Sequence, residues 1–348
     1  MTNRFDAMLG EREWLLTDGA TGTNLFALGL EHGDSPEEWN LERQDKVREH
    51  YRSFIDAGSD LILTNTFGGT VNRLKLHGLD AKVHEINAAA ARLLRQEIDA
   101  AKDAGGREVI CAGDIGPTGD LFEPIGPIAH ASGVASFRAQ MEGLAEGGAD
   151  VLWIETMSSE EEFAAALEAA GEVGLPIVGT MSFDTNGRTM MGVTPSRLAG
   201  IVHGCDHGRR PRAWGGNCGT GAPDLLIGLI SAQGEIGPDD LLVAKANCGI
   251  PEYVDGAIRY SGTTELMADY AVLARDLGVK IIGGCCGTKP EHVRAMREAL
   301  ETVPRGPRPT PEDVIAKLGA CTGTTMELIH GPAAGAPPAR RRRRRSAA

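Results

Sequence analysis

Short apolar runs alternate along this chain with longer stretches in which apolar residues recur every three or four positions. The runs are rich in β-branched and aliphatic residues and end in Gly, Ser, Thr or Asn, which is typical of buried parallel strands that lead into loops. The longer stretches, such as VHEINAAAARLLRQEIDAAKDAG and SFRAQMEGLAEGGA, have the periodicity of amphipathic helices. The runs that predict strands cover residues 14–22, 60–69, 108–116, 149–156, 176–183, 213–218, 241–249 and 279–287.

A strand followed by a helix, repeated eight times within about 300 residues, is what a (β/α)₈ barrel requires. A doubly wound open sheet is the alternative, because a count of strands does not show whether the sheet closes. We therefore predict an α/β fold, a (β/α)₈ TIM barrel, over residues 1–303.

Residues 304–348 differ in composition from the predicted barrel. They are rich in Pro, Gly and Ala and contain an unbroken cationic run from Arg340 to Arg345, so we expect a largely disordered tail. The run is either solvated or in contact with an acidic subunit surface, nucleic acid or an anionic membrane. Within the tail, PEDVIAKLG predicts a single helix with Pro311 in its first turn.

Composition narrows the class of protein. The N-terminal segment MTNRFDAMLGEREW is charged, and the chain has no run of about 18 apolar residues, so we expect neither a signal peptide nor a membrane span and predict a cytoplasmic protein. The net charge of −13 argues against nucleic acid as the main partner. An odd number of cysteines, seven, favours reduced thiols, metal ligation or catalysis over a disulfide framework.

Polar and sulfur residues gather where the predicted strands end. In a (β/α)₈ barrel these ends meet at one face, which is where barrel enzymes carry out their chemistry. Three cysteines come from two such ends: Cys218 after the sixth strand, and Cys285 with Cys286 after the eighth. The other residues at these ends include Asp18, Asn65, Thr66, Asp114, Glu155, Ser182, Asp184, Asn247 and Cys248.

Three thiols at one face predict a catalytic zinc site. Adjacent cysteines rarely bridge each other, and the glycines on both sides of these cysteines let the backbone turn tightly. Three sulfur ligands favour zinc and leave its fourth position open, where a substrate thiol would bind and lose its proton. Iron–sulfur ligation would normally use a fourth cysteine. Buried thiols that act only as small apolar side chains are the remaining alternative.

Several segments resemble the zinc-dependent homocysteine S-methyltransferases, in the order and spacing of that family and over roughly residues 10–300: DGATGTNL (18–25), TNTFGG (64–69), WIET (153–156), GGNCGTG (215–221) and GGCCGT (283–288). Within the family the chain is similar to bacterial betaine–homocysteine methyltransferases, on the strength of DGATGTNLF, RLKLHG, GTMSFDTNGRTMMGVTP and YSGTTELMADYAVLARD. The resemblance implies a (β/α)₈ barrel, in agreement with the strand count.

The resemblance also implies roles for individual residues. Cys218, Cys285 and Cys286 would be the catalytic zinc ligands. Asp18 and Glu155 would hold the ammonium group of homocysteine, which as a zwitterion needs buried acceptors. The further substrate-binding candidates are Gly19 and Ala20 in the GATGT turn, Ser182 and Asn217.

Glycine betaine is the expected methyl donor, with methionine and dimethylglycine as products. Betaine carries a quaternary ammonium and a carboxylate. We expect an aromatic ring to contact the ammonium, and a cationic side chain or an amide to bind the carboxylate. The candidates near predicted loops are Trp39, Phe67, Phe183, Tyr253 and Tyr260 for the face, and Arg188 or Asn186 for the carboxylate. The chain has no predicted strand that is followed by the motif G-x-G-x-x-G. The sequence therefore does not suggest a dinucleotide-type fold that would bind S-adenosylmethionine.

Some alternatives stay open. The donor could be S-methylmethionine, dimethylsulfoniopropionate or a methylcorrinoid protein, and the chain could be a non-catalytic zinc or thiol carrier. Cys248 could lie near the zinc or be a buried small side chain, and a homo-oligomer is possible. The segment HGCDH (203–207) has ligand-like spacing but precedes the sixth strand, so we expect it on the surface away from the site.

Overall fold

The computed structural model describes residues 3–254, 257–321 and 325–330. Eight parallel strands form one sheet in the order β1-β10-β7-β6-β5-β4-β3-β2, and a parallel bridge between Thr17 and Leu61 joins its two ends. The predicted (β/α)₈ barrel is therefore confirmed, and the open sheet is wrong. The strands are β1 (Leu15–Leu16), β2 (Leu61–Leu63), β3 (Ile110–Ile115), β4 (Val151–Met157), β5 (Ile177–Met181), β6 (Ala213–Cys218), β7 (Leu242–Ala246) and β10 (Val279–Gly284).

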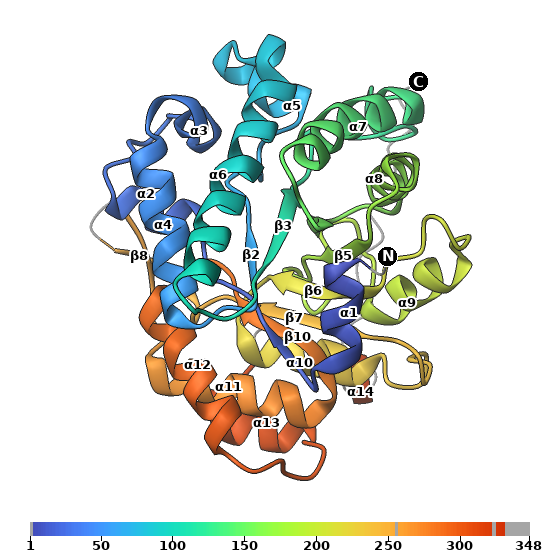
Figure 1. Cartoon of the computed structure of the whole chain (residues 1–348). Helices are drawn as coiled ribbons and strands as arrows, with labels where there is room; N and C mark the ends of the chain where they lie inside the picture. Colours follow the sequence, from blue (N-terminus) through green and yellow to red (C-terminus); the bar gives the residue numbers. More distant parts are fainter. Residues whose placement is uncertain (1–2, 255–256, 322–324, 331–348) are drawn as a thin grey trace, which may run out of the picture.

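Helices surround the strands (Figure 1). Helix α8 shows how the sequence sets their ends: the Ser159 side chain accepts a hydrogen bond from the Glu162 amide, and Gly174 ends the helix at φ 84°. The helices are α1 (Arg4–Glu11), α2 (Gly22–Ala27), α3 (Trp39–Glu42), α4 (Gln44–Ala57), α5 (Val71–Leu74), α6 (Val83–Asp103), α7 (His130–Glu146), α8 (Glu160–Val173), α9 (Pro195–Gly204), α10 (Ala222–Ser231), α11 (Thr264–Leu277), α12 (Pro290–Thr302), α13 (Pro311–Leu318) and α14 (Glu327–His330), with 3₁₀ turns at Pro36–Glu38, Lys75–His77 and Asp80–Lys82.

The barrel interior is layered, because every second residue of a strand points inwards. An apolar layer that includes Ala112, Trp153 and Val243 packs with Phe5 and Met8 of α1. Two residues further along the same strands, the inward positions hold Asp114, Glu155 and Lys245, which line a cavity. The strand period thus places a charged layer directly above the apolar core.

A two-stranded hairpin, β8 (Pro251–Val254) with β9 (Ala257–Tyr260), lies between β7 and α11 and was not predicted. It is antiparallel and separate from the barrel sheet. Its strands have only four residues each, too short for a clear hydrophobic alternation. The strand label β10 therefore belongs to the eighth barrel strand.

Helix α13 confirms the helix predicted with Pro311 in its first turn. Val314 is fully buried and Leu318 is 6% exposed, and the helix contacts α10 and α11. This part of the expected tail is therefore helical and packed on the barrel helices. Arg340–Arg345 lie outside the described residues.

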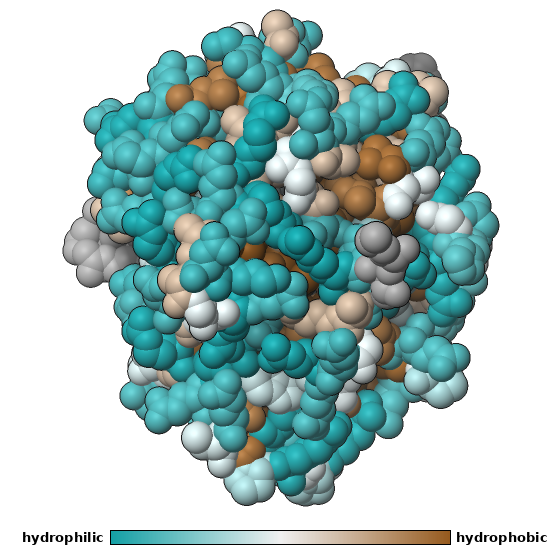
Figure 2. All heavy atoms as spheres, viewed as in Figure 1, coloured by the Kyte–Doolittle hydropathy of each residue, from teal (hydrophilic) through white to brown (hydrophobic). Residues whose placement is uncertain are grey.

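On the face shown in Figure 2, hydrophilic residues predominate and hydrophobic residues form small separate patches. Among the described residues, none of the helices combines the length and the apolar character that crossing a membrane requires.

Candidate active site

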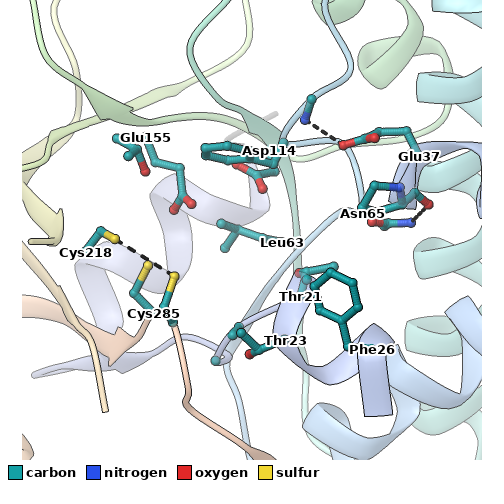
Figure 3. A pocket seen from close by; sticks show the side chains of 18 of the residues that line it. Thr21, Thr23, Phe26, Glu37, Leu63, Asn65, Asp114, Glu155, Cys218 and Cys285 are labelled. Atoms are coloured by element: carbon teal, nitrogen blue, oxygen red, sulfur yellow. Dashed lines mark hydrogen bonds between the residues drawn. The ribbon is translucent and has the colours of Figure 1, made fainter. Parts of the chain in front are cut away.

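The ends of β6 and β10 bring the three predicted thiols together. Cys218 is the last residue of β6, and Cys285 and Cys286 directly follow β10. Their Sγ atoms all lie within 4.8 Å of one another, with 4.0 Å between those of Cys218 and Cys286 (Figure 3). Within the described part of the chain, no other group of His, Cys, Asp or Glu side chains has a geometry that could hold a metal ion.

Two asparagines hold the loops that carry these thiols. Asn217 accepts hydrogen bonds from the Thr156 amide at 2.8 Å and the Thr180 hydroxyl at 2.7 Å, which ties the end of β6 to β4 and β5. Asn247 accepts from the Cys286 amide at 3.0 Å and donates to the Gly219 carbonyl at 2.7 Å. The positions of the sulfur atoms are thus set by buried side-chain hydrogen bonds.

The backbone at this point is unusual. Cys218 has φ 59° and Thr156 has φ 62°, in the left-handed region that residues other than glycine rarely adopt. Asn217, which is 1% exposed, bonds to Thr156 through both its amide oxygen and its amide nitrogen. Strained backbone of this kind persists where the surrounding structure holds it, and it clusters at functional sites.

The three thiols interact with one another. Hydrogen bonds from Cys218 and Cys285 lower the pKa of Cys286 to about 3. Hydrogen bonds with Cys285 and then Cys286 raise the pKa of Cys218 above its usual range. The cluster therefore stabilises a thiolate, which is the form that binds a metal cation.

A buried ionic group lies beside the thiols. The Lys245 ammonium is 3.2 Å from Glu155 Oε2 and 3.7 Å from Asp18 Oδ1, and it lies 5.3 Å from the centre of the Trp153 ring. Trp153 Nε1 also donates to Glu155 Oε2 at 3.2 Å, and the Leu63 amide donates to Asp18 Oδ2 at 2.8 Å. Lys245 thus stands between the two carboxylates expected to hold an ammonium group.

Burial dominates the electrostatics of this group. Burial raises the pKa of Asp18 to about 7, although the Lys245 charge opposes the shift. Burial also raises the pKa of Glu155, again against the influence of Lys245. Burial alone would lower the pKa of Lys245, but the Glu155 and Asp18 charges outweigh it and raise that pKa, so the lysine stays charged.

Asp114 belongs to the same group. Its side chain is 3% exposed, and its Oδ1 atom is buried with no hydrogen-bond partner. Burial, followed by the charge of Glu155, raises the pKa of Asp114 well above its usual range. Asp18 Oδ1 likewise lacks a hydrogen-bond partner, so the ionic group holds two buried acceptors without hydrogen bonds.

A cavity of about 390 Å³ connects these groups (Figure 3). The thiols and the ionic group line one part, and residues from the loops after β1 and β2 line another. Its walls comprise Gly19, Ala20, Thr21, Gly22, Thr23, Phe26, Asp34, Pro36, Glu37, Leu63, Asn65, Phe67, Gly68, Arg73, His77, Asp114, Glu155, Thr156, Cys218, Lys245, Cys285 and Cys286.

Of the remaining predicted substrate-binding residues, some line the cavity and others do not. Gly19 and Ala20 line the cavity, but the Ala20 amide donates to the Thr288 carbonyl at 3.1 Å. Ser182 is buried outside the cavity walls, and its amide donates to the Met157 carbonyl. Asn217 does not line the cavity, and its hydrogen bonds to Thr156 and Thr180 hold the end of β6 that carries Cys218.

The donor candidates also separate. Phe67 lines the cavity, whereas Trp39 and Phe183 are buried in the hydrophobic core. Tyr260 is half-buried and packs against Gly287, directly after Cys286. Arg188 and Asn186 are exposed and do not line the cavity, and the Tyr253 side chain lies outside the described structure.

Two cysteine questions have structural answers. Cys248 is 1% exposed, packs close to Gly262 and does not belong to the three-thiol group, so it is a buried small side chain. In HGCDH, His203 in the last turn of α9 bonds to Asp240 at 2.8 Å and is exposed, as expected for a surface segment away from the site.

Sequence reasoning missed Lys245, Phe26 and Arg73. The lysine inside the apolar run LLVAKANCG could have indicated a charged residue in the barrel interior. Lys245 lies two residues after Val243, so along a strand both side chains point to the same, inner face. Phe26 and Arg73 lie on the short helices α2 and α5, and no comparable sequence signal shows that these helices border the cavity.

The sequence matches a known protein family, and the fold is similar to solved structures. The homocysteine S-methyltransferase model matches residues 15–300. The fold is similar to that of the homocysteine methyltransferase MmuM from Escherichia coli, metallated form, with a TM-score of 0.70 and 23% identity over 84% of this chain and 98% of that one. Its oxidized form matches with a TM-score of 0.70 and 22% identity over 85% and 99% of the two chains.

The family match starts at β1 and ends within α12, so it spans the whole barrel and both cysteine segments. Since it covers far more than half of the chain, this protein belongs to the homocysteine S-methyltransferase family.

Proposed function

We propose that this protein moves a methyl group from glycine betaine to the sulfur of homocysteine at a zinc site, giving methionine and dimethylglycine. One observation carries the proposal: three thiols within 4.8 Å of one another share a cavity with a buried group of carboxylates. The thiols suit a metal that holds the acceptor sulfur, and the carboxylates suit the acceptor's ammonium.

The three sulfur ligands suit zinc. Cys218, Cys285 and Cys286 are free thiols on two rigid strand ends, and an all-sulfur set favours zinc over magnesium or calcium. These three residues would hold the ion and leave one position open. When bound, zinc would lower the pKa of a coordinating substrate thiol, so that homocysteine reacts as a thiolate. The similarly folded MmuM is known in a metallated form, which supports a metal here.

The chain's own residues would orient homocysteine. Asp18 and Glu155 are buried acceptors for its ammonium, and Glu155 lines the same cavity as the three thiols. Apolar and backbone walls such as Leu63 and Gly19 exclude water around the reacting sulfur. Holding the two reactants in one orientation can supply much of the rate enhancement.

The wall formed by the loops after β1 and β2 supports an onium carboxylate as the donor. Phe26 and Phe67 offer aromatic faces for a quaternary ammonium. Arg73 is half-buried, lines the same cavity and makes no ion pair with any described residue, so it is available for a carboxylate. Betaine carries both groups.

The reaction is a displacement at carbon. The homocysteine sulfur attacks a betaine methyl carbon, a carbon–sulfur bond forms, and the carbon–nitrogen bond breaks. The bonding pair returns to nitrogen, which becomes the neutral amine of dimethylglycine. The donor therefore needs no proton from the protein, and the residues serve to bind, align and exclude water.

A donor panel tests the proposal. Zinc-loaded protein is given homocysteine with betaine, S-methylmethionine or dimethylsulfoniopropionate, and methionine is measured by mass spectrometry. We expect methionine with betaine. Methionine with only one of the other compounds would overturn the betaine assignment and keep the acceptor, whereas none with any donor would favour a methylcorrinoid donor or a carrier role.

A pair of cysteine variants tests the metal site. Cys286→Ala should lower bound zinc well below about one ion per chain and reduce turnover by more than about 100-fold, because a ligand is lost. Cys205→Ala is the matched control: this half-buried thiol bonds to the Ile201 carbonyl and does not belong to the cluster. Full activity of Cys286→Ala without zinc would refute the proposal.

A further inference from the structure

Besides the two carboxyl groups expected to hold an ammonium, the ionic group contains a third, that of Asp114, which lines the cavity. Asp18, Glu155 and Asp114 supply three carboxylates, and Lys245 supplies one ammonium. Asp114, Glu155 and Lys245 line the cavity, and Asp18 lies directly behind Lys245, 3.7 Å from its ammonium. All four side chains are at most 7% exposed. Buried charges require partners, so this group is set to receive a further cation.

Lys245 determines which oxygens remain open. Glu155 Oε2 already accepts hydrogen bonds from Lys245 and Trp153, and Asp18 Oδ2 accepts one from the Leu63 amide. Asp18 Oδ1 and Asp114 Oδ1 accept none. An incoming ammonium would therefore find unused acceptors on Asp18 and Asp114, beside the second oxygen of Glu155, of which only Oε2 is engaged.

The Asp114 side chain is held for such a role by its backbone. Its amide donates to the Thr64 hydroxyl at 2.9 Å, and its carbonyl accepts from Thr66 at 2.7 Å and Gln140 at 3.1 Å. The backbone is thus fully bonded, while the carboxyl group projects into the cavity without a hydrogen bond (Figure 3). A purely structural carboxylate would be expected to have partners of its own.

We infer that Asp114 is a third carboxylate of the homocysteine ammonium site and determines the preference for an α-amino thiol, while Lys245 is a positioning residue that holds Glu155 and Asp18. This rests on homocysteine as the acceptor and not on the identity of the donor. The site would therefore take an amino acid thiol and reject the same thiol without its amino group.

The test compares two thiols, L-homocysteine and 4-sulfanylbutanoate, which lacks only the amino group. Binding of each to zinc-loaded protein is measured by calorimetry without any methyl donor, so a wrong donor cannot affect the result. In Asp114→Asn, homocysteine should bind about 10- to 100-fold more weakly, the usual effect of losing a hydrogen bond to a charged group. Binding of 4-sulfanylbutanoate should stay within about threefold.

Controls separate this role from a structural one. Asp99→Asn, on the outer helix α6, removes the same charge from an exposed site and should leave both affinities unchanged. Asp114→Asn should keep its zinc and unfold no earlier than the wild type, because the buried carboxyl group has no hydrogen bond to lose. Asp114→Ser, a smaller side chain, should show the same selective loss.

Two outcomes would overturn the inference. One is an equal loss of affinity for both thiols, with lower thermal stability, which would make Asp114 structural. The other is unchanged homocysteine binding in both variants. If the wild type binds no homocysteine at all, the inference and the proposed acceptor both fail, whereas tight binding without methylation by betaine counts only against the donor.

Discussion

At the scale of single residues, His50 on α4 is an unusual buried group outside the site. It is 2% exposed, and neither ring nitrogen has a hydrogen-bond partner. Its ring packs 5.2 Å from that of Phe54 in an edge-on arrangement and 5.8 Å from that of Tyr51. Burial lowers the pKa of His50 from 6.5 to about 4, so it is held neutral in the folded state.

This gives a pH prediction. Between pH 6.5 and about 4 the unfolded chain binds a proton at His50 that the folded protein does not, so stability is full above pH 6.5 and falls as the pH decreases. The loss should approach roughly 3 kcal/mol near pH 4. Urea unfolding of wild type and His50→Leu across this range measures it.

The Leu variant lacks the titrating group and should lose correspondingly less stability on acidification. At pH 7 it should be about as stable as the wild type, because the imidazole has no hydrogen bond to replace. Parallel pH profiles for the two proteins would show that His50 does not titrate in this way.

At the scale of elements, the close packing of β6 against β7 is what brings Cys218 to its position. A Cβ atom added at Gly215 would lie 2.0 Å from the Val243 carbonyl oxygen. This oxygen belongs to the backbone of the neighbouring strand β7, in which Val243 is paired with Gly215. It cannot be relieved by moving a flexible side chain, so the first glycine of GGNC is a requirement of the sheet.

Gly215→Ala should therefore be strongly destabilising, by about 3 kcal/mol or more, and should reduce zinc binding because the end of β6 shifts. Gly200→Ala is the matched control: it lies inside helix α9 with no heavy atom within 4 Å of the added Cβ. Helix propensity should make that variant up to about 1 kcal/mol more stable. Wild-type stability of Gly215→Ala in thermal unfolding would contradict the tight strand approach.

At the scale of the whole molecule, the chain after α12 returns to the barrel helices. Arg275 of α11 donates to the Val303 carbonyl at 2.6 Å and the Pro304 carbonyl at 3.0 Å, which directs the chain towards α13. There Val314 is fully buried against the barrel helices. The helix after residue 303 thus adds to the same hydrophobic core as the barrel.

Val314→Ala should cost about 2 kcal/mol in the free energy of unfolding, the scale expected for removing two buried methyl groups. Val303→Ala removes the same groups from a side chain that is 43% exposed and should change stability by less than about 0.5 kcal/mol. Chemical denaturation of both variants measures the difference. Equal stabilities would mean that α13 contributes nothing to the folded core.

The sequence by itself determined the eight strands, the barrel that they form and the three thiols at one face. Hydrophobic periodicity and the rule that parallel strand ends share a face depend only on local pattern and chain direction, so a single sequence carries them. The same pattern placed Asp18 and Glu155 at the ends of predicted strands, and their role in binding an ammonium group stays a prediction.

Only the tertiary structure decided how these residues meet. The successive registers from β4 through β5 and β6 to β7 place the Lys245 ammonium 3.2 Å from Glu155, and the closure between β1 and β2 brings Asp18 beside Lys245. The same long-range packing leaves Asp114 without a hydrogen bond and removes Ser182 from the cavity. Register and loop course depend on contacts between residues far apart in the chain, and local hydrophobic pattern does not specify them.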